Sequence, residues 1–126
     1  MHTCLTYFYV DTTKSTNFDL QNFVSTLGIT TQNYQLRDNG CLRIGENNCY
    51  NVDANAMVKH TLAPIWDKRD ALVALAKQYN LTYYLVRVPH IHANSDAPKP
   101  LLSLDADIVA FLHQTATHDD IDYYVY

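Results

Sequence analysis

The apolar pattern at the start of the chain predicts a β-strand over residues 3–11, which are rich in aromatic and β-branched side chains. Side chains alternate between the two faces of a strand. Both faces are apolar here, with Leu5, Tyr7 and Tyr9 on one and Cys4, Phe8 and Val10 on the other. Because strands that are apolar on both faces are typical of the middle of a sheet, we expect this strand to be central.

The next pattern has the 3.6-residue period of an amphipathic helix. Its apolar stripe consists of Leu20, Phe23, Val24 and Leu27. Asp19 is placed to cap the helix, and Phe18 and Phe23 have the spacing of a hydrophobic staple. Gly28 suits the left-handed residue that ends many helices, so this helix has a signal at each end.

Between residues 31 and 52 the composition shifts to Asn, Gln, Thr and Gly, with short alternating pieces at 34–36 and 41–44. Asn39-Gly40, which lies between these pieces, favours a tight hairpin turn. We therefore expect two short strands in this region, followed by an exposed loop at 45–48.

Helical periodicity resumes at residue 54. Asp53 can cap a helix over 54–61, with Val52 stapled to Met57. Pro64 lacks an amide hydrogen, so it either starts a new helical segment or kinks a continuous one. The apolar stripe then continues through Ile65, Leu72, Ala76 and Tyr79.

The last part of the chain predicts two strands separated by a loop and a helix. Residues 81–88 form a core strand that Pro89 ends, because proline cannot donate to a strand ladder. A loop is expected over 90–100, and a helix over 105–116 capped by Asp105. The polar run 118–120 suits a turn, and the apolar residues 121–126 predict a final strand paired in the interior of the sheet.

This order of elements favours an α+β fold in a single domain spanning residues 1–126. We expect a two-layer sandwich, ferredoxin-like in its chain order. It would have a mainly antiparallel or mixed sheet and about three helices packed on one face. A doubly wound α/β sheet is less favoured, because its helices would cover both faces and its crossovers would be more uniform.

Composition limits the partners. The net charge of −4 opposes binding to phosphate backbones, so we expect no nucleic-acid partner. The first residues lack a basic region, and no apolar run is long enough to span a bilayer, which predicts a soluble cytoplasmic protein with no membrane partner.

The three cysteines are scattered, which favours free thiols in a reducing compartment. The alternative is a bridge between Cys41 and Cys49 across a hairpin.

Three segments of the chain resemble a known family. They are Tyr7-Phe8-Tyr9-Val10, the segment from Phe18-Asp19-Leu20 to Leu27-Gly28-Ile29, and the ending from Leu102-Ser103-Leu104-Asp105 through the last six residues. Together they look like the uncharacterised bacterial family called domain of unknown function 4279, over nearly the whole chain. Relatives usually have a Trp in a short strand ahead of the long helix, whereas this chain has Cys49-Tyr50-Asn51 there and its Trp at position 66. The resemblance implies a small α+β bacterial protein and no established activity, ligand or catalytic residue.

Candidate metal ligands lie near Pro89. His90 and His92 fall on one side of an extended segment, and Asp96 follows within reach, with His118 as a further candidate. The ordinary alternative is a pair of solvated histidines in a loop, because zinc sites need three or four ligands. We expect no cofactor, since the chain has only Gly28, Gly40 and Gly45 and therefore no glycine-rich loop for a phosphate.

The tyrosines are the second candidate. Tyr7 and Tyr9, together with Tyr83 and Tyr123, could place several phenols on the sheet face away from the helices, joined by Tyr84, Tyr124 and Tyr126. Tyrosine is enriched in interface anchors, although ordinary packing also uses it. Two functions remain open: a non-catalytic module that binds a protein partner or itself, resembling an immunity or regulatory protein, and a small metal-assisted hydrolase using His90 and His92.

Overall fold

The computed structural model describes residues 2–49, 53–96 and 103–126, which form six strands, four α-helices and one short 3₁₀-helix. The strands are β1 (Thr3–Asp11), β2 (Tyr34–Leu36), β3 (Leu42–Cys49), β4 (Thr82–Ile91), β5 (His118–Ile121) and β6 (Tyr124–Val125). The helices are α1 (Leu20–Leu27), α2 (Ala54–Leu62), η1 (Ala63–Ile65), α3 (Arg69–Tyr79) and α4 (Ala106–Gln114).

The strands form one mixed sheet in the order β2-β3-β1-β4-β5, with β6 also paired to β4. β1 is antiparallel to β3 and β4, and β2 is antiparallel to β3, whereas β5 and β6 run parallel to β4. The first four strands and their helices follow the βαββαβ pattern of a ferredoxin-like unit. The expected α+β sandwich is therefore confirmed, and β1 is central, as its two apolar faces predicted.

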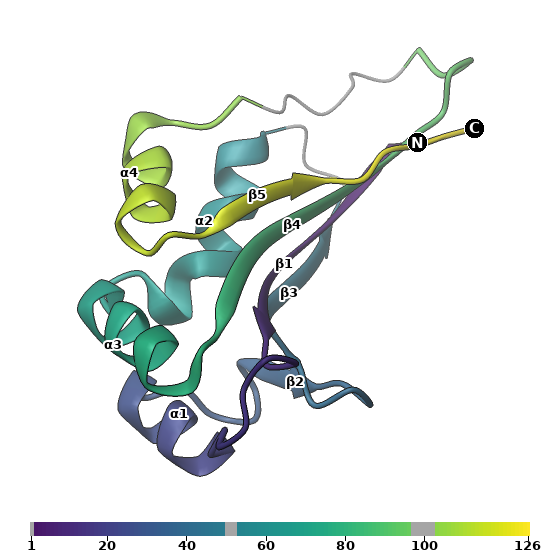
Figure 1. The fold of residues 1–126 in the computed structure, drawn as a ribbon. Coiled ribbons are helices and arrows are strands. Elements are labelled where there is room, and N and C mark those ends of the chain that lie inside the picture. Colours follow the sequence, from purple (N-terminus) through teal and green to yellow (C-terminus); the bar gives the residue numbers. More distant parts are fainter. Residues whose placement is uncertain (1, 50–52, 97–102) are drawn as a thin grey trace.

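The four α-helices lie on one side of the sheet, and no described element covers the other side (Figure 1). We call these the helix face and the open face. The region of residues 54–79 contains two α-helices because Pro64 lies in η1, which separates α2 from α3. The core between the two layers includes the fully buried side chains of Phe8, Phe23, Leu62, Leu72, Leu85 and Phe111.

The central strand shows the difference between the two faces. Cys4, Phe8 and Val10 point to the helix face and are at most 1 % exposed. Leu5, Tyr7 and Tyr9 alternate with them on the open face and remain partly exposed. Helices thus cover only one of the two apolar faces of β1.

α1 follows its sequence signals closely. The Asp19 side chain accepts a hydrogen bond from the backbone N–H of Asn22 at 3.1 Å, as an N-cap does. The rings of Phe18 and Phe23 are 5.5 Å apart between centroids, which confirms the staple. Gly28 ends the helix with a φ of +68°. Local signals were sufficient here because each acts within one helical turn.

The expected cap of α4 is only partly confirmed. Asp105 occupies the N-cap position, but its side chain makes no capping hydrogen bond. The carboxylate instead lies 3.5 Å from the ammonium of Lys59 on α2, which also pairs with Asp107 at 3.3 Å. The carboxylate of Asp105 therefore joins α4 to α2 instead of closing the first turn of its own helix.

This difference between the two caps gives a testable prediction. We expect Asp19→Ala to lower the free energy of unfolding by about 1 kcal/mol, because the first turn of α1 loses its acceptor. Asp105→Ala should cost clearly less, since it removes an exposed ion pair and no cap. Urea unfolding of both variants measures the difference, and equal losses would contradict it.

The loop expected at residues 45–48 is wrong, because β3 continues through this segment to Cys49. The strand continues because Gly45 has a φ of +65° and lies where the β1–β3 register shifts, so it absorbs a bulge without ending the strand. Its N–H still donates to the carbonyl of Asn33 at 2.8 Å. Beyond it, Asn47 and Asn48 pair with Thr6 and Leu5 of β1.

A disulfide between Cys41 and Cys49 is not possible in this arrangement. Cys41 is a buried free thiol just before β3, and Cys49 is the last residue of that strand. Their Cα atoms are therefore roughly 25 Å apart along one extended strand, whereas a disulfide requires less than about 7 Å. The alternative of a bridge between Cys41 and Cys49 is therefore excluded.

The expected end of β4 at Pro89 is also wrong, because the strand continues to Ile91 and includes His90. Hydrogen-bonding groups alternate along a strand, and the carbonyls of Arg87 and Ile91 accept from Asp122 and Tyr126 at the β5–β6 edge. The backbone nitrogen of Pro89 therefore also faces this edge. It lies opposite the break between β5 and β6, where no amide hydrogen is needed.

The C-terminal strand is paired but is not interior. It forms two short edge strands, β5 and β6, and the turn expected at 118–120 is part of β5. Tyr124, Val125 and Tyr126 are 46–65 % exposed. The edge position explains the polar residues 118–120 of β5, because an edge strand has no second neighbouring strand and tolerates charged side chains.

Three expectations fall on residues outside the described ranges, namely the staple of Val52, the loop beyond Asp96 and the place of Leu102. Of the helices that the structure describes, none has both the length and the apolarity that crossing a bilayer requires.

Candidate functional site

The open face of the sheet is hollowed into a groove with a volume of about 330 Å³. It runs across the two central strands to the β5 edge, and we call it the tyrosine groove. Its lining residues are Tyr7, Tyr9 and Asp11 of β1, Tyr84, Val86 and Val88 of β4, and Asp120 and Asp122 at the edge. The alternation of strand side chains produces this set, because β1 and β4 place their uncovered faces side by side.

The aromatic rings of the tyrosine groove form a continuous row. The rings of Tyr7 and Tyr9 are 6.4 Å apart between centroids, and those of Tyr9 and Tyr84 are 6.3 Å apart. The guanidinium carbon of Arg43 lies 4.0 Å from the centroid of Tyr7, which is a cation–π contact. One ring of the row therefore already binds a cation of the chain itself.

Three carboxyl groups line the tyrosine groove. The hydroxyl of Thr13 donates to Asp11 at 2.6 Å and its backbone N–H at 2.9 Å, which lowers the pKa of Asp11 and keeps it ionised. The charge of Asp122, together with the hydrogen bond that it accepts from Tyr124 at 3.2 Å, raises the pKa of that tyrosine.

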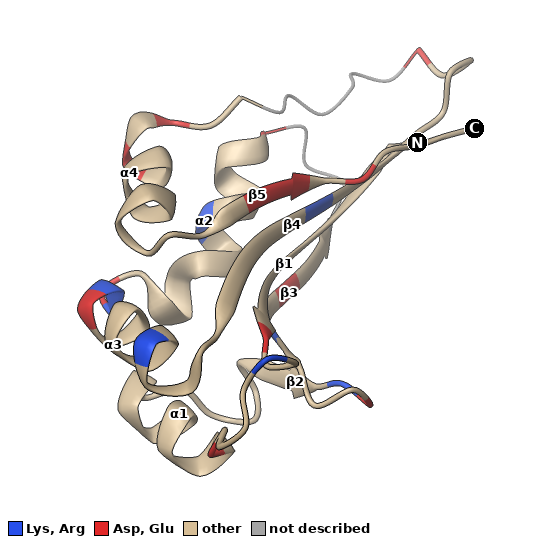
Figure 2. Cartoon of the chain, in the orientation of Figure 1, with Lys and Arg blue, Asp and Glu red and all other residues tan. Residues whose placement is uncertain are grey.

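The acidic residues are concentrated at one side of the tyrosine groove. Figure 2 shows this concentration as red along β5 and the segment that follows it. Within the described part of the chain, the side chain of Asp120 makes no hydrogen bond or ion pair, so its charge is available to a ligand.

Tyr83 is a correction to the expected set of surface tyrosines. Its side chain points to the helix face, is 1 % exposed and donates a hydrogen bond to the carbonyl of Leu72 at 2.7 Å. Burial raises the pKa of its hydroxyl well above the usual value. The neighbouring Tyr84 is on the open face, while Tyr123 lies between β5 and β6 and is 49 % exposed.

The candidate metal ligands do not form a cluster. The ring of His90 stacks on those of Tyr124 and Tyr126, and the ring of His92 stacks on Tyr126. Asp96 is exposed, and the described residues contain no group of three potential metal-ligating side chains.

The further candidate ligand His118 is too distant. It pairs with Tyr84, six residues before His90 on β4, and is therefore roughly 20 Å from that histidine. The site that the hydrolase hypothesis needs is not present among these residues.

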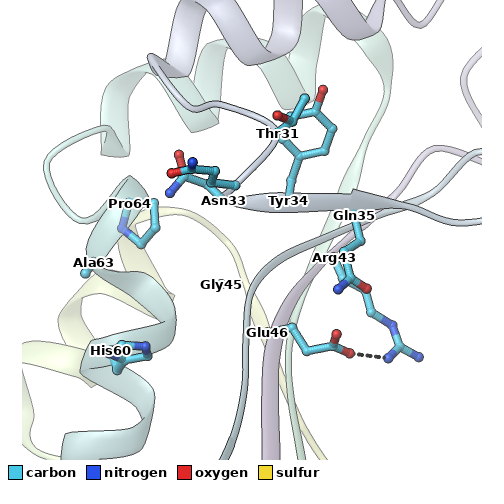
Figure 3. Close-up of a pocket in the computed structure, with 11 residues that line it drawn as sticks. Thr31, Asn33, Tyr34, Gln35, Arg43, Gly45, Glu46, His60, Ala63 and Pro64 are labelled. Atoms are coloured by element: carbon cyan, nitrogen blue, oxygen red, sulfur yellow. Dashed lines mark hydrogen bonds and ion pairs between the residues drawn. The ribbon is translucent and has the colours of Figure 1, made fainter.

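A second cavity of about 360 Å³ lies where the β2–β3 hairpin meets α2 and η1 (Figure 3). His60 and Pro64 lie on its helical side, and Arg43 and Glu46 form an ion pair of 2.8 Å at the strand side. No hydrogen bond joins His60 to Glu46, so the described lining of this cavity lacks a connected acid–base pair. Its opposite charges are already paired, which makes the tyrosine groove the stronger candidate.

Sequence reasoning missed Arg43 and Asp120. The sequence pattern gives Arg43 only a place in a short strand, and it gives Asp120 only a place in a turn. The register places Arg43 opposite Tyr9, and Asp120 beside Val86. Asp120 lines the tyrosine groove, and Arg43 contacts the Tyr7 ring of that groove. Both come from strands whose pairing the sequence could not fix, so no local signal would have found them.

Comparison with known proteins adds no relative, because the chain matches no protein-family model, no curated protein and no solved structure. The resemblance to domain of unknown function 4279 therefore stays a prediction.

Proposed function

We propose that this protein is a non-catalytic binding module whose open face docks a partner protein with a basic surface. The observation that supports this function most directly is the tyrosine groove, in which three aromatic rings and three carboxyl groups share one uncovered sheet face. Tyrosine is favoured at interfaces because it buries a large area at low cost in side-chain entropy. Negative charge around such rings steers and selects a positively charged partner.

Charge also favours a foreign partner over a second copy of the chain. Two copies that met through their open faces would bring Asp120 and Asp122 of each chain towards a like surface, in a protein whose net charge is already −4. Arg43 could offset little of this repulsion, since Glu46 already pairs with it. The self-association considered from the sequence is therefore the weaker version of the proposal.

Charge reversal tests the docking face. In affinity capture from cells that express the chain, we expect the wild type to retain a basic partner in stoichiometric amount. Asp120→Lys with Asp122→Lys should abolish capture, because both exposed carboxylates at the groove are reversed. A second variant, Tyr84→Ala, should weaken it by at least about tenfold, the loss typical of an interface anchor.

A matched control has the same change in net charge on the helical layer. Asp67→Lys with Asp70→Lys alters two exposed aspartates near α3, and capture should persist. Circular dichroism verifies that each variant is folded. Three outcomes would contradict the proposal. Both double variants could lose the partner, both could retain it, or the wild type could form a dimer that the groove variants dissociate.

A further inference from the structure

The tyrosine groove has a floor, walls and a charged edge of different chemistry. Val86 and Val88 supply apolar surface, and Tyr9 and Tyr84 place their rings beside it. Asp120 and Asp122 follow along the neighbouring strand edge, where Asp120 is paired in register with Val86. A ligand lying across the groove would therefore meet aliphatic side chains, π faces and carboxylates within one site, because Asp120 lies beside Val86 and the paired Tyr9 and Tyr84 are the next residues on that face.

We infer that the tyrosine groove binds an organic cation on an aliphatic stem, as presented by a lysine or arginine side chain of the partner. The stem packs on the two valines, the cationic head lies against the rings of Tyr9 and Tyr84, and Asp120 accepts its hydrogen bonds. This inference rests on the proposed function, because it names the group that the docked partner would insert.

The chain itself contains a precedent for this mode of binding. Arg43 projects onto the same face, with its guanidinium over Tyr7 and its charge paired with Glu46 at 2.8 Å. Ring and carboxylate together thus hold one guanidinium at one end of the row. Tyr9 and Tyr84 with Asp120 repeat this combination at the other end, where the described residues supply no cation to Asp120.

Small model cations test the inference without the partner. In an NMR titration of the full chain, n-butylammonium and n-butylguanidinium should shift the signals of the rings of Tyr9 and Tyr84 and the amide of Asp120. Neutral 1-butanol should bind about fivefold or more weakly, the factor expected from about 1 kcal/mol of cation–π and charge attraction. The two cations distinguish a site for lysine from a site for arginine.

Two conservative variants separate the contributions. Tyr84→Leu keeps apolar volume but removes a π face, and Asp120→Asn with Asp122→Asn keeps shape but removes charge. Each should weaken cation binding about fivefold and leave 1-butanol unaffected, and added salt should weaken only the cations. Equal binding of cations and alcohol, or shifts confined to other surfaces, would overturn the inference.

The two proposals fail in different ways. Capture of a groove-dependent partner without binding of either cation would refute the cation subsite and leave the docking face standing. Cation binding that the groove variants weaken, with no partner captured, would refute the proposed function and leave the subsite standing.

Discussion

Replacing Gly45 by alanine is expected to lower the free energy of unfolding by about 3 kcal/mol or more, or to prevent folding. A Cβ atom built at Gly45 would overlap the carbonyl oxygen of Thr61 and lie 2.8 Å from its carbonyl carbon. Both are backbone atoms of α2, so a change of rotamer cannot relieve the overlap. The positive φ of Gly45, +65°, adds the strain of a left-handed conformation.

The same contact explains why the variant should affect more than one strand. Thr61 also hydrogen-bonds to Thr6 of β1 through its hydroxyl at 2.7 Å, so α2 is fixed against two neighbouring strands at one point. Moving α2 outward to admit a methyl group would lengthen this buried hydrogen bond and open the core around Val58 and Leu62.

Gly28→Ala is the matched control, because Gly28 has a φ of +68° and, apart from its neighbours in the chain, no atom of the described residues lies within 4 Å of the position that a Cβ would take there. It should cost only about 1 kcal/mol of backbone strain. Urea unfolding of both variants, followed by far-ultraviolet circular dichroism, gives the comparison. If the two variants lost similar amounts of unfolding free energy, the close approach of α2 to β3 would not be what constrains Gly45.

The second large effect is expected at Asp119. Its carboxylate accepts two hydrogen bonds from Arg87, at 3.1 Å from Nε and 2.6 Å from the terminal nitrogen, while the Arg87 side chain is only 3 % exposed. Asp119→Ala removes the carboxylate and leaves a buried guanidinium without this partner. Because 34 % of the Asp119 side chain is exposed, we expect a loss of about 2–3 kcal/mol, below that for a fully buried pair.

A double variant separates charge from packing. Arg87→Met with Asp119→Ala removes both charges and keeps an aliphatic side chain on the helix face, so it should be more stable than Asp119→Ala alone. Thermal and urea unfolding of the wild type, both single variants and the double variant complete a thermodynamic cycle. A double variant whose loss equals the sum of the single losses would show that the two side chains do not interact.

Elements specified by neighbouring residues were predictable from the sequence. α1 has its cap, staple and left-handed end within a few residues, and the two apolar faces of β1 indicated a central strand. Elements specified by pairing were not. Pro89 looked like the end of a strand, yet its missing amide hydrogen lies opposite a break in the adjacent edge, which exists only once β5 and β6 are in place.

The candidate site shows the same limit at a finer scale. Tyr83 and Tyr84 are adjacent and chemically identical, and only the choice of face makes one a core residue and the other a groove residue. Leu81 and Leu85 share the buried face with Tyr83, whereas Thr82 shares the other face with Tyr84. Thr82 was thus the one polar residue that could have indicated which face of β4 is uncovered. This indication is weak because the apolar Val86 and Val88 follow on the same face.

The pairing of β1 with β4 has a consequence for biosynthesis. β1 ends at Asp11, but the strand that covers one of its edges begins only at Thr82, roughly 70 residues later. At typical elongation rates of about 5–20 residues per second, that interval lasts roughly 4–14 s on the ribosome. During this time the edge of β1 that later pairs with β4 is unpaired and accessible to chaperones or to other chains. Slower translation of residues 12–81 should therefore favour aggregation.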